Sequence, residues 1–135
     1  MLRSSLVEDC YESAVAAIEA DVTIETSILR NVKPRTTDGL FGDGFVLMAA
    51  DPMRGSATLT GSLIEGAARA GIAAFGSRIA MGNTASMCAT FPLAGESYEG
   101  VPFSFEKTGD NACGCSAAAE LCQVDSPGLA PPPVK

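Results

Sequence analysis

The chain has 135 residues, of which 47% are hydrophobic and 19% charged, with a mean hydropathy of +0.22 and a net charge of −7. This length fits one domain, which can bury about two-thirds of the surface that the unfolded chain exposes. The acidic balance disfavours nucleic acid as a partner, and charged residues interrupt every apolar window long enough to span a bilayer, so no membrane span is expected.

The first half of the chain predicts one helix and two strands. Ser5–Glu8 has the pattern of a capping box, and apolar residues then recur at helical spacing, which predicts an amphipathic helix over 5–20. Residues 22–28 alternate between apolar and polar side chains, as a half-buried strand does. A long polar connection over 31–42 leads to residues 45–50, which are apolar on both faces and predict a central strand.

A second capping box, Ser62–Glu65, opens a predicted helix over 62–74. Residues 78–91 flank the pair Gly82-Asn83, whose first glycine suits a type II′ turn. We therefore expect an antiparallel β-hairpin over 78–91, directly after the second helix.

The last third predicts a strand, a short helix and a tail. Residues 101–106 alternate in polarity but contain a proline, which cannot donate to a ladder, so they form an edge strand. An Ala-rich helix is expected over 109–123. We find no internal repeat, and the fold expected is α+β: a mostly antiparallel sheet of four to five strands, packed with two or three helices. Residues 1–125 form its single domain and 126–135 a Pro-rich tail.

The five cysteines bear on the compartment and on a possible site. An odd count excludes an intramolecular disulfide framework that pairs all five, which favours a reducing, intracellular compartment. Acidic residues follow the first six residues at once, so we recognise no signal peptide. Three cysteines lie close together and form a candidate thiol cluster: Cys113, Cys115 and Cys122. They suit a metal site, a redox pair or a crosslink to another chain, or are small buried residues.

The sequence contains no histidine, so any catalysis would depend on carboxylates, thiols or backbone amides. Asp43, between two glycines, and Asp51, before a proline, are candidate ligands for Mg or Mn. A straight strand would hold them about 20 Å apart, so each would supply only half of a site.

The segment around Asp43 is similar to segments of several families. Gly42–Leu47 resembles the metal-aspartate hairpin of class III nucleotide cyclases, and Phe45–Asp51 is similar to segments of metal-dependent phosphatases and uracil phosphoribosyltransferases. The Gly-Asp-Gly triplet is also similar to a motif of thiamine-diphosphate enzymes. One short segment that resembles four unrelated families identifies none of them.

The low charge and the absence of histidine favour a non-catalytic structural or assembly subunit of an oligomeric particle or larger complex. Its contacts to other protein chains, in a homo- or hetero-oligomer, would use the Ala-rich helix, the edge strand and a C-terminal arm. The arm consists of Pro131, Pro132, Pro133 and Val134. The alternative is a metal-dependent enzyme or pseudoenzyme that acts on nucleotides or phosphate esters, with Asp43 as metal ligand.

Overall fold

A computed structural model describes residues 1–49, 55–115 and 122–132, and these residues form three parallel five-stranded sheets. Sheet A consists of β1 (Leu2–Arg3), β4 (Asp21–Glu25), β7 (Ser56–Thr60), β10 (Arg78–Gly82) and β13 (Ser104–Thr108). Sheet B consists of β2 (Leu6–Tyr11), β5 (Ile28–Lys33), β8 (Leu63–Ala67), β11 (Ala85–Met87) and β14 (Ala112–Gly114). Sheet C consists of β3 (Ser13–Ile18), β6 (Asp43–Met48), β9 (Ala70–Phe75), β12 (Phe91–Glu96) and β15 (Val124–Asp125).

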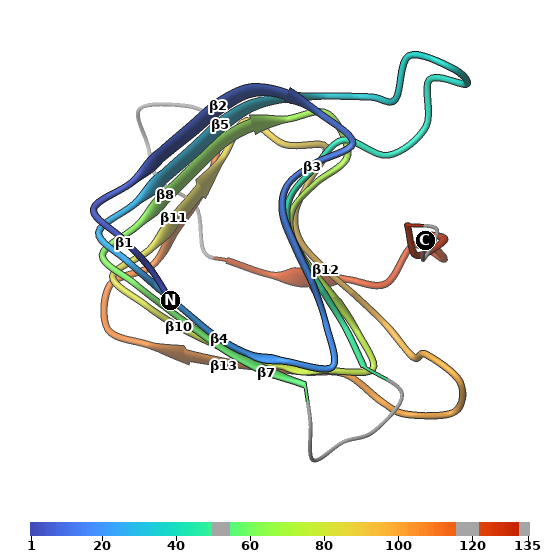
Figure 1. Cartoon of the computed structure of the whole chain (residues 1–135). Coiled ribbons are helices and arrows are strands. Elements are labelled where there is room, and N and C mark those ends of the chain that lie inside the picture. The colour runs from blue at the N-terminus through green and yellow to red at the C-terminus, as the bar shows by residue number, and fades with distance from the viewer. Residues whose placement is uncertain (50–54, 116–121, 133–135) are drawn as a thin grey trace.

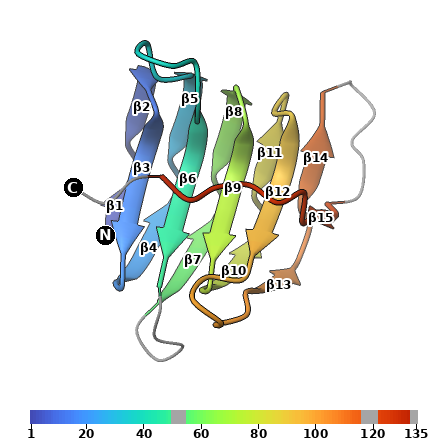
Figure 2. The ribbon, with the colours of Figure 1, turned by 90° about the vertical axis from the view of Figure 1, so that its right-hand side faces the viewer.

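Each turn of the chain contributes one strand to every sheet, so the five turns are the coils of a parallel β-helix. Figure 1 looks along the stack with the first coil in front, and Figure 2 shows the coils side by side. Residues on neighbouring coils are 22 positions apart where no loop intervenes, as between Arg3 and Glu25. The loop before β6 and the segment between β6 and β7 lengthen the second coil.

The predicted α+β fold with a mostly antiparallel sheet is wrong: all paired strands of the three sheets are parallel, and the described residues contain no helix. The helix predicted over 5–20 is β2 and β3. Asp9 and Glu12 have positive φ angles of 56° and 72° and turn the chain there. Each such turn shifts the phase of apolar alternation, which therefore imitates the period of a helix.

The helix predicted over 62–74 is β8 and β9, and Gly66, with φ +70°, shifts the alternation in the same way. The helix predicted over 109–123 begins as β14, and residues 116–121 of that prediction lie outside the described residues. Because residues 62–74 form strands and the described part of 109–123 contains no helix, the described residues offer no Ala-rich helix as a contact surface.

The predicted hairpin over 78–91 is also wrong, because β10 and β11 belong to different sheets. Asn83, with φ +49°, sits at the corner between them. The strand predicted over 45–50 is confirmed as β6, which spans Asp43–Met48, while residue 50 lies outside the described residues. The edge strand predicted over 101–106 is found in part, as β13 at the edge of sheet A, which begins after Pro102. The statement that the chain has no internal repeat is wrong, since every coil repeats the same three strands and corners.

Two apolar clusters stabilise the stack. The larger cluster fills the inside of the β-helix, with one or more inward side chains from each coil, such as Ile24, Leu59 and Ile79. The smaller one lies on sheet C, where Val46, Ala73 and Phe75 are at most 1% exposed. The C-terminal segment crosses the strands of sheet C on its outer face (Figure 2), with Leu129 packed against this second cluster. Residues 1–49, 55–115 and 122–132 include no helix of the length and hydrophobicity required to cross a membrane.

Candidate functional site

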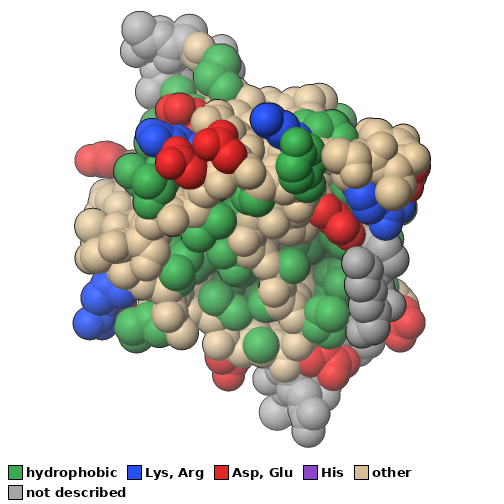
Figure 3. All heavy atoms as spheres, turned by 45° about the horizontal axis from the view of Figure 1, so that its top comes forward, with side chains coloured by type: hydrophobic (Ala, Val, Ile, Leu, Met, Phe, Trp, Pro, Cys, Tyr) green, Lys and Arg blue, Asp and Glu red, His purple; other side chains and the backbone are tan. Residues whose placement is uncertain are grey.

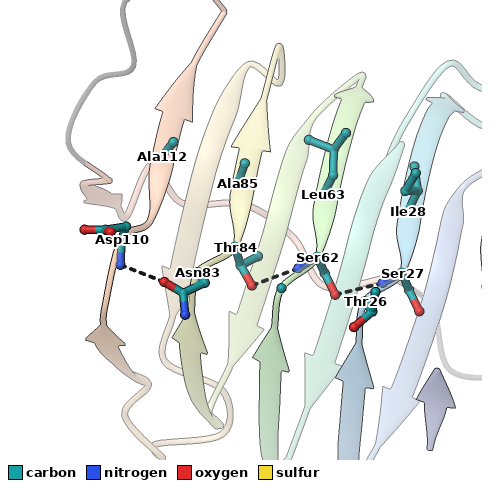
Figure 4. A pocket seen from close by; sticks show the side chains of 11 residues that line it. Thr26, Ser27, Ile28, Ser62, Leu63, Asn83, Thr84, Ala85, Asp110 and Ala112 are labelled. Carbon is teal, nitrogen blue, oxygen red and sulfur yellow. Dashed lines mark hydrogen bonds between the residues drawn. The ribbon is translucent and has the colours of Figure 1, made fainter. Parts of the chain in front are cut away.

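A ladder of buried polar side chains runs along the corner between sheets A and B (Figure 4). From the second coil on, the hydroxyl or amide oxygen at this corner accepts a hydrogen bond from a backbone N–H of the coil before it. The four steps are Ser5 N to Ser27 Oγ at 3.2 Å, Ser27 N to Ser62 Oγ at 3.2 Å, Ser62 N to Thr84 Oγ1 at 3.4 Å, and Thr84 N to Asn111 Oδ1 at 3.0 Å. The ladder thus fixes the order and direction of the coils.

Each ladder hydroxyl also donates to the carbonyl two residues earlier, as Ser62 Oγ does to Thr60 O at 3.0 Å. A shallow groove of about 360 Å³ follows the corner above the ladder, between the polar tips of Thr26, Asn83 and Asp110 and the apolar side chains that begin sheet B. The three hydroxyls that line this groove, those of Ser27, Ser62 and Thr84, each donate to a carbonyl and accept from a backbone N–H inside the fold. The groove is a consequence of the corner geometry.

The ladder is incomplete at the first coil. Ser5 Oγ donates to Arg3 O at 2.8 Å, but among the described residues no backbone N–H donates to Ser5 Oγ. In the next three coils the corresponding hydroxyl has such a donor, which comes from the coil before it. The acceptor at Ser5 therefore points to where a further coil would lie.

The first coil also leaves the inside of the β-helix partly uncovered. Leu2, Val7, Val15 and Ala17 point inward but are only half-buried. Their neighbours one coil further are almost inaccessible: Ile24 0%, Leu29 1%, Phe45 0% and Leu47 0%. The difference arises because in the described residues no coil stacks on the first one.

The surface of the first coil carries further apolar groups. Large hydrophobic side chains that are about half or more exposed include Met1, Leu6, Tyr11 and Ile18, all of the first coil. Figure 3 views this end obliquely and shows hydrophobic side chains in the middle of the face, with most charged ones toward its margin. The strands β2 and β3, six residues each, present unpaired backbone edges here.

The opposite end is built differently, because disulfides tie the last coil. Cys113 pairs with Cys122, and Cys88 of the fourth coil pairs with Cys115. The first pair is almost inaccessible, at 2% and 6%, although it belongs to the last coil. The edge strands β14 and β15 are only three and two residues long. In sheet A the edge strand at this end, β13, has five residues, so this end has shorter edges than the first coil in sheets B and C only.

These disulfides overturn the predicted reducing, intracellular compartment. The odd count of cysteines excluded only a scheme that pairs all five; four are paired and Cys10 is the remaining thiol. Two disulfides indicate an oxidising environment such as the extracellular space. The three residues of the predicted thiol cluster, Cys113, Cys115 and Cys122, are therefore structural crosslinks of this fold.

Asp43 lies at the start of β6 and is fully buried. Its Oδ1 accepts from Arg69 Nε at 2.9 Å and from the backbone N–H of Ala70 at 3.1 Å, and its Oδ2 accepts from Arg69 Nη2 at 2.6 Å. The Arg69 guanidinium lies 4.9 Å from the centre of the Phe41 ring. Both carboxylate oxygens are thus engaged, and a cation at Asp43 would have to displace the guanidinium.

The other predicted site residues are not brought together with Asp43. Asp51, Pro133 and Val134 lie outside the described residues. Pro131 is half-buried and Pro132 is buried against sheet C, where Pro132 lines a hollow with Tyr11 and Met48. In the described part of the chain, no three acidic or cysteine side chains converge as they would around a metal ion.

The chain matches no protein-family model, and neither the curated proteins nor the solved structures include one that is detectably similar to it. The first coil was missed as a site by sequence analysis because its residues were assigned to a helix. The recurrence of a serine followed by two apolar residues at Ser5, Ser27 and Ser62 is the signal that could have found it.

Proposed function

We propose that this protein is a non-catalytic assembly subunit, and that the open end of its first coil docks against a β-coil of another polypeptide. The observation that supports this most strongly is the half-buried state of the inward side chains of the first coil. A β-helix that leaves such residues in water loses the free energy of burying them, about 25 cal/mol per Å² of apolar surface.

The chemistry of this end favours one kind of partner. An apolar side chain or a lipid could cover Val7 and Val15, but it would satisfy neither the backbone edges of β2 and β3 nor Ser5 Oγ. A further coil satisfies all three groups. Its inward apolar residues cover Val7 and Val15, its parallel strands pair with β2 and β3, and its corner N–H donates to Ser5 Oγ. We therefore expect the partner to be a β-coil in register with the first one.

A peptide of Met1–Glu19 with Cys10→Ser is a suitable probe. In this protein the same segment forms the first coil, whose strands pair with β4, β5 and β6 of the second coil. A free copy would pair in the same way with β1, β2 and β3 at the open end. A labelled copy should bind the full chain saturably, as measured by fluorescence anisotropy. Val15→Lys in the protein should weaken the binding by at least about tenfold, since it places a charge where the probe's apolar side chains stack.

The matched control is Thr58→Lys, which adds the same charge at an exposed position on sheet A. It should bind the probe as the wild type does. Equal binding by the Val15→Lys variant, or no binding by the wild type, would contradict the proposal. Circular dichroism and thermal unfolding of both variants separate a loss of the docking end from a loss of the fold.

A further inference from the structure

The outer face of sheet C holds the protein's own C-terminal segment as a bound peptide. Its apolar floor consists of Val46, Ala73, Phe75 and Ala94, each at most 1% exposed. Figure 2 shows residues after β15 crossing β12, β9, β6 and β3 in turn. The segment therefore runs across the strands, and it is held on the face of the sheet without joining its ladder.

Two charged side chains hold the backbone of this segment. The Glu96 carboxylate accepts from the Gly128 N–H at 2.7 Å, the Leu129 N–H at 2.9 Å and the Ser126 hydroxyl at 2.9 Å. Arg69, already paired with Asp43, donates through Nη1 to the Ala130 carbonyl at 2.8 Å. Because most of these contacts reach main-chain groups, they select an extended backbone more than particular side chains.

The apolar contacts explain the composition of the segment. Leu129 packs against the cluster on sheet C, and Pro131 and Pro132 follow it, half-buried and buried. Proline has no N–H to satisfy, so it can lie on a sheet face where no acceptor is available. Gly128 and Ala130 between these anchors are exposed.

We infer that the outer face of sheet C is a binding groove for extended, uncharged peptides with a leucine followed by prolines, and that the C-terminal segment is its built-in competitor. A second polypeptide with a Gly-Leu-Ala-Pro-Pro sequence would make the same main-chain contacts to Glu96 and Arg69. It would bind only to the fraction of molecules whose C-terminal segment has left the groove, because the two peptides compete for one site.

The test uses a labelled, end-blocked peptide of residues 126–132, Ser-Pro-Gly-Leu-Ala-Pro-Pro, and the full chain. Leu129→Ser in the protein weakens the resident segment and leaves the groove intact. Since Leu129 is half-buried, this variant should bind the peptide about tenfold more tightly than the wild type in fluorescence anisotropy.

The same background shows whether Glu96 forms the site. Leu129→Ser with Glu96→Gln should bind the peptide at least about tenfold more weakly than Leu129→Ser alone, because the charged acceptor is lost. Glu106→Gln, which neutralises an exposed glutamate on sheet A, should change nothing. The inference is overturned if Leu129→Ser fails to raise the affinity, or if Glu96→Gln fails to lower it in a variant whose thermal unfolding is unchanged.

Discussion

The ion pair between Asp43 and Arg69 gives a sharp stability prediction, because Asp43 is fully buried. Asp43→Ala removes the acceptor of three hydrogen bonds and leaves the Arg69 guanidinium, whose side chain is 15% exposed, without its counter-ion. Removing one partner of a buried pair costs about 3–5 kcal/mol, and the partial exposure of Arg69 favours the lower end. We expect the free energy of unfolding to fall by about 3 kcal/mol.

Urea unfolding of the wild type, Asp43→Ala, Arg69→Met and the double variant measures this effect. The double variant should be less destabilised than the sum of the single ones, since it leaves no buried charge unpaired. Asp110→Ala, which removes an exposed carboxylate, should change the free energy of unfolding by no more than about 0.5 kcal/mol. A loss below about 1 kcal/mol for Asp43→Ala would refute the assignment of a structural ion pair.

The same variants distinguish the ion pair from a metal site. A cation bound at Asp43 would raise the melting temperature with Mg²⁺ concentration, and Asp43→Ala would abolish that rise. Since both carboxylate oxygens already accept from Arg69 and Ala70, we expect no dependence of the wild type on millimolar Mg²⁺. A Mg²⁺-dependent rise that is lost in the variant would contradict this account.

Three further predictions concern the crosslinks, the ladder and one surface carboxylate. Cys88→Ser opens a disulfide that joins residues 27 positions apart, and calorimetry should show a loss of about 3.5 kcal/mol from the freer unfolded chain. Ser62→Ala leaves the N–H of Ser27 without its acceptor and should cost about 1–3 kcal/mol in urea unfolding, whereas Ser62→Thr should be nearly neutral because the next coil carries threonine there. The hydrogen bond from the Arg35 guanidinium holds the pKa of the Asp38 carboxyl below its usual range. Ionised Asp38 therefore stabilises the fold at pH values above its pKa in the unfolded chain, and this contribution is lost as the pH falls through its pKa in the folded chain. An NMR titration should show that lowered pKa, and Arg35→Met should raise it toward the ordinary value.

The sequence contained the repeat of this fold, but in a form that also predicts helices. Ser5, Ser27 and Ser62 each directly precede a strand of sheet B, at separations of 22 and 35 residues. In two of these segments, Ser5–Glu8 and Ser62–Glu65, a glutamate follows three residues after the serine. A serine three residues before a glutamate is a capping box when a helix follows. Here its hydroxyl accepts from the neighbouring coil, and only the recurrence of the motif distinguishes the two structures.

Other features could not be predicted from local sequence, because they join distant residues. Asp43 meets Arg69 across 26 positions, and nothing near either residue identifies the other as its partner. The pairing of Cys88 with Cys115 depends on their stacking in adjacent coils. The β6 strand was predicted correctly because it is apolar on both faces, which any buried strand of a parallel sheet requires.

The open end can be tested most directly by adding one coil to it. Leu2, Ile24, Leu59 and Met81 occupy the same position in successive coils. A copy of residues 56–79 placed directly before Met1 therefore keeps the register, because Met1 and Leu2 then take the places of residues 80 and 81. Hydrogen exchange by mass spectrometry should then show the amides of β2 and β3 exchanging about tenfold more slowly than in the unextended chain. The same extension with its inward residues Leu59, Ile64 and Ile72 changed to serine should give no protection. Unchanged exchange of β2 and β3 in the first extension would contradict the claim that this end accepts a further coil.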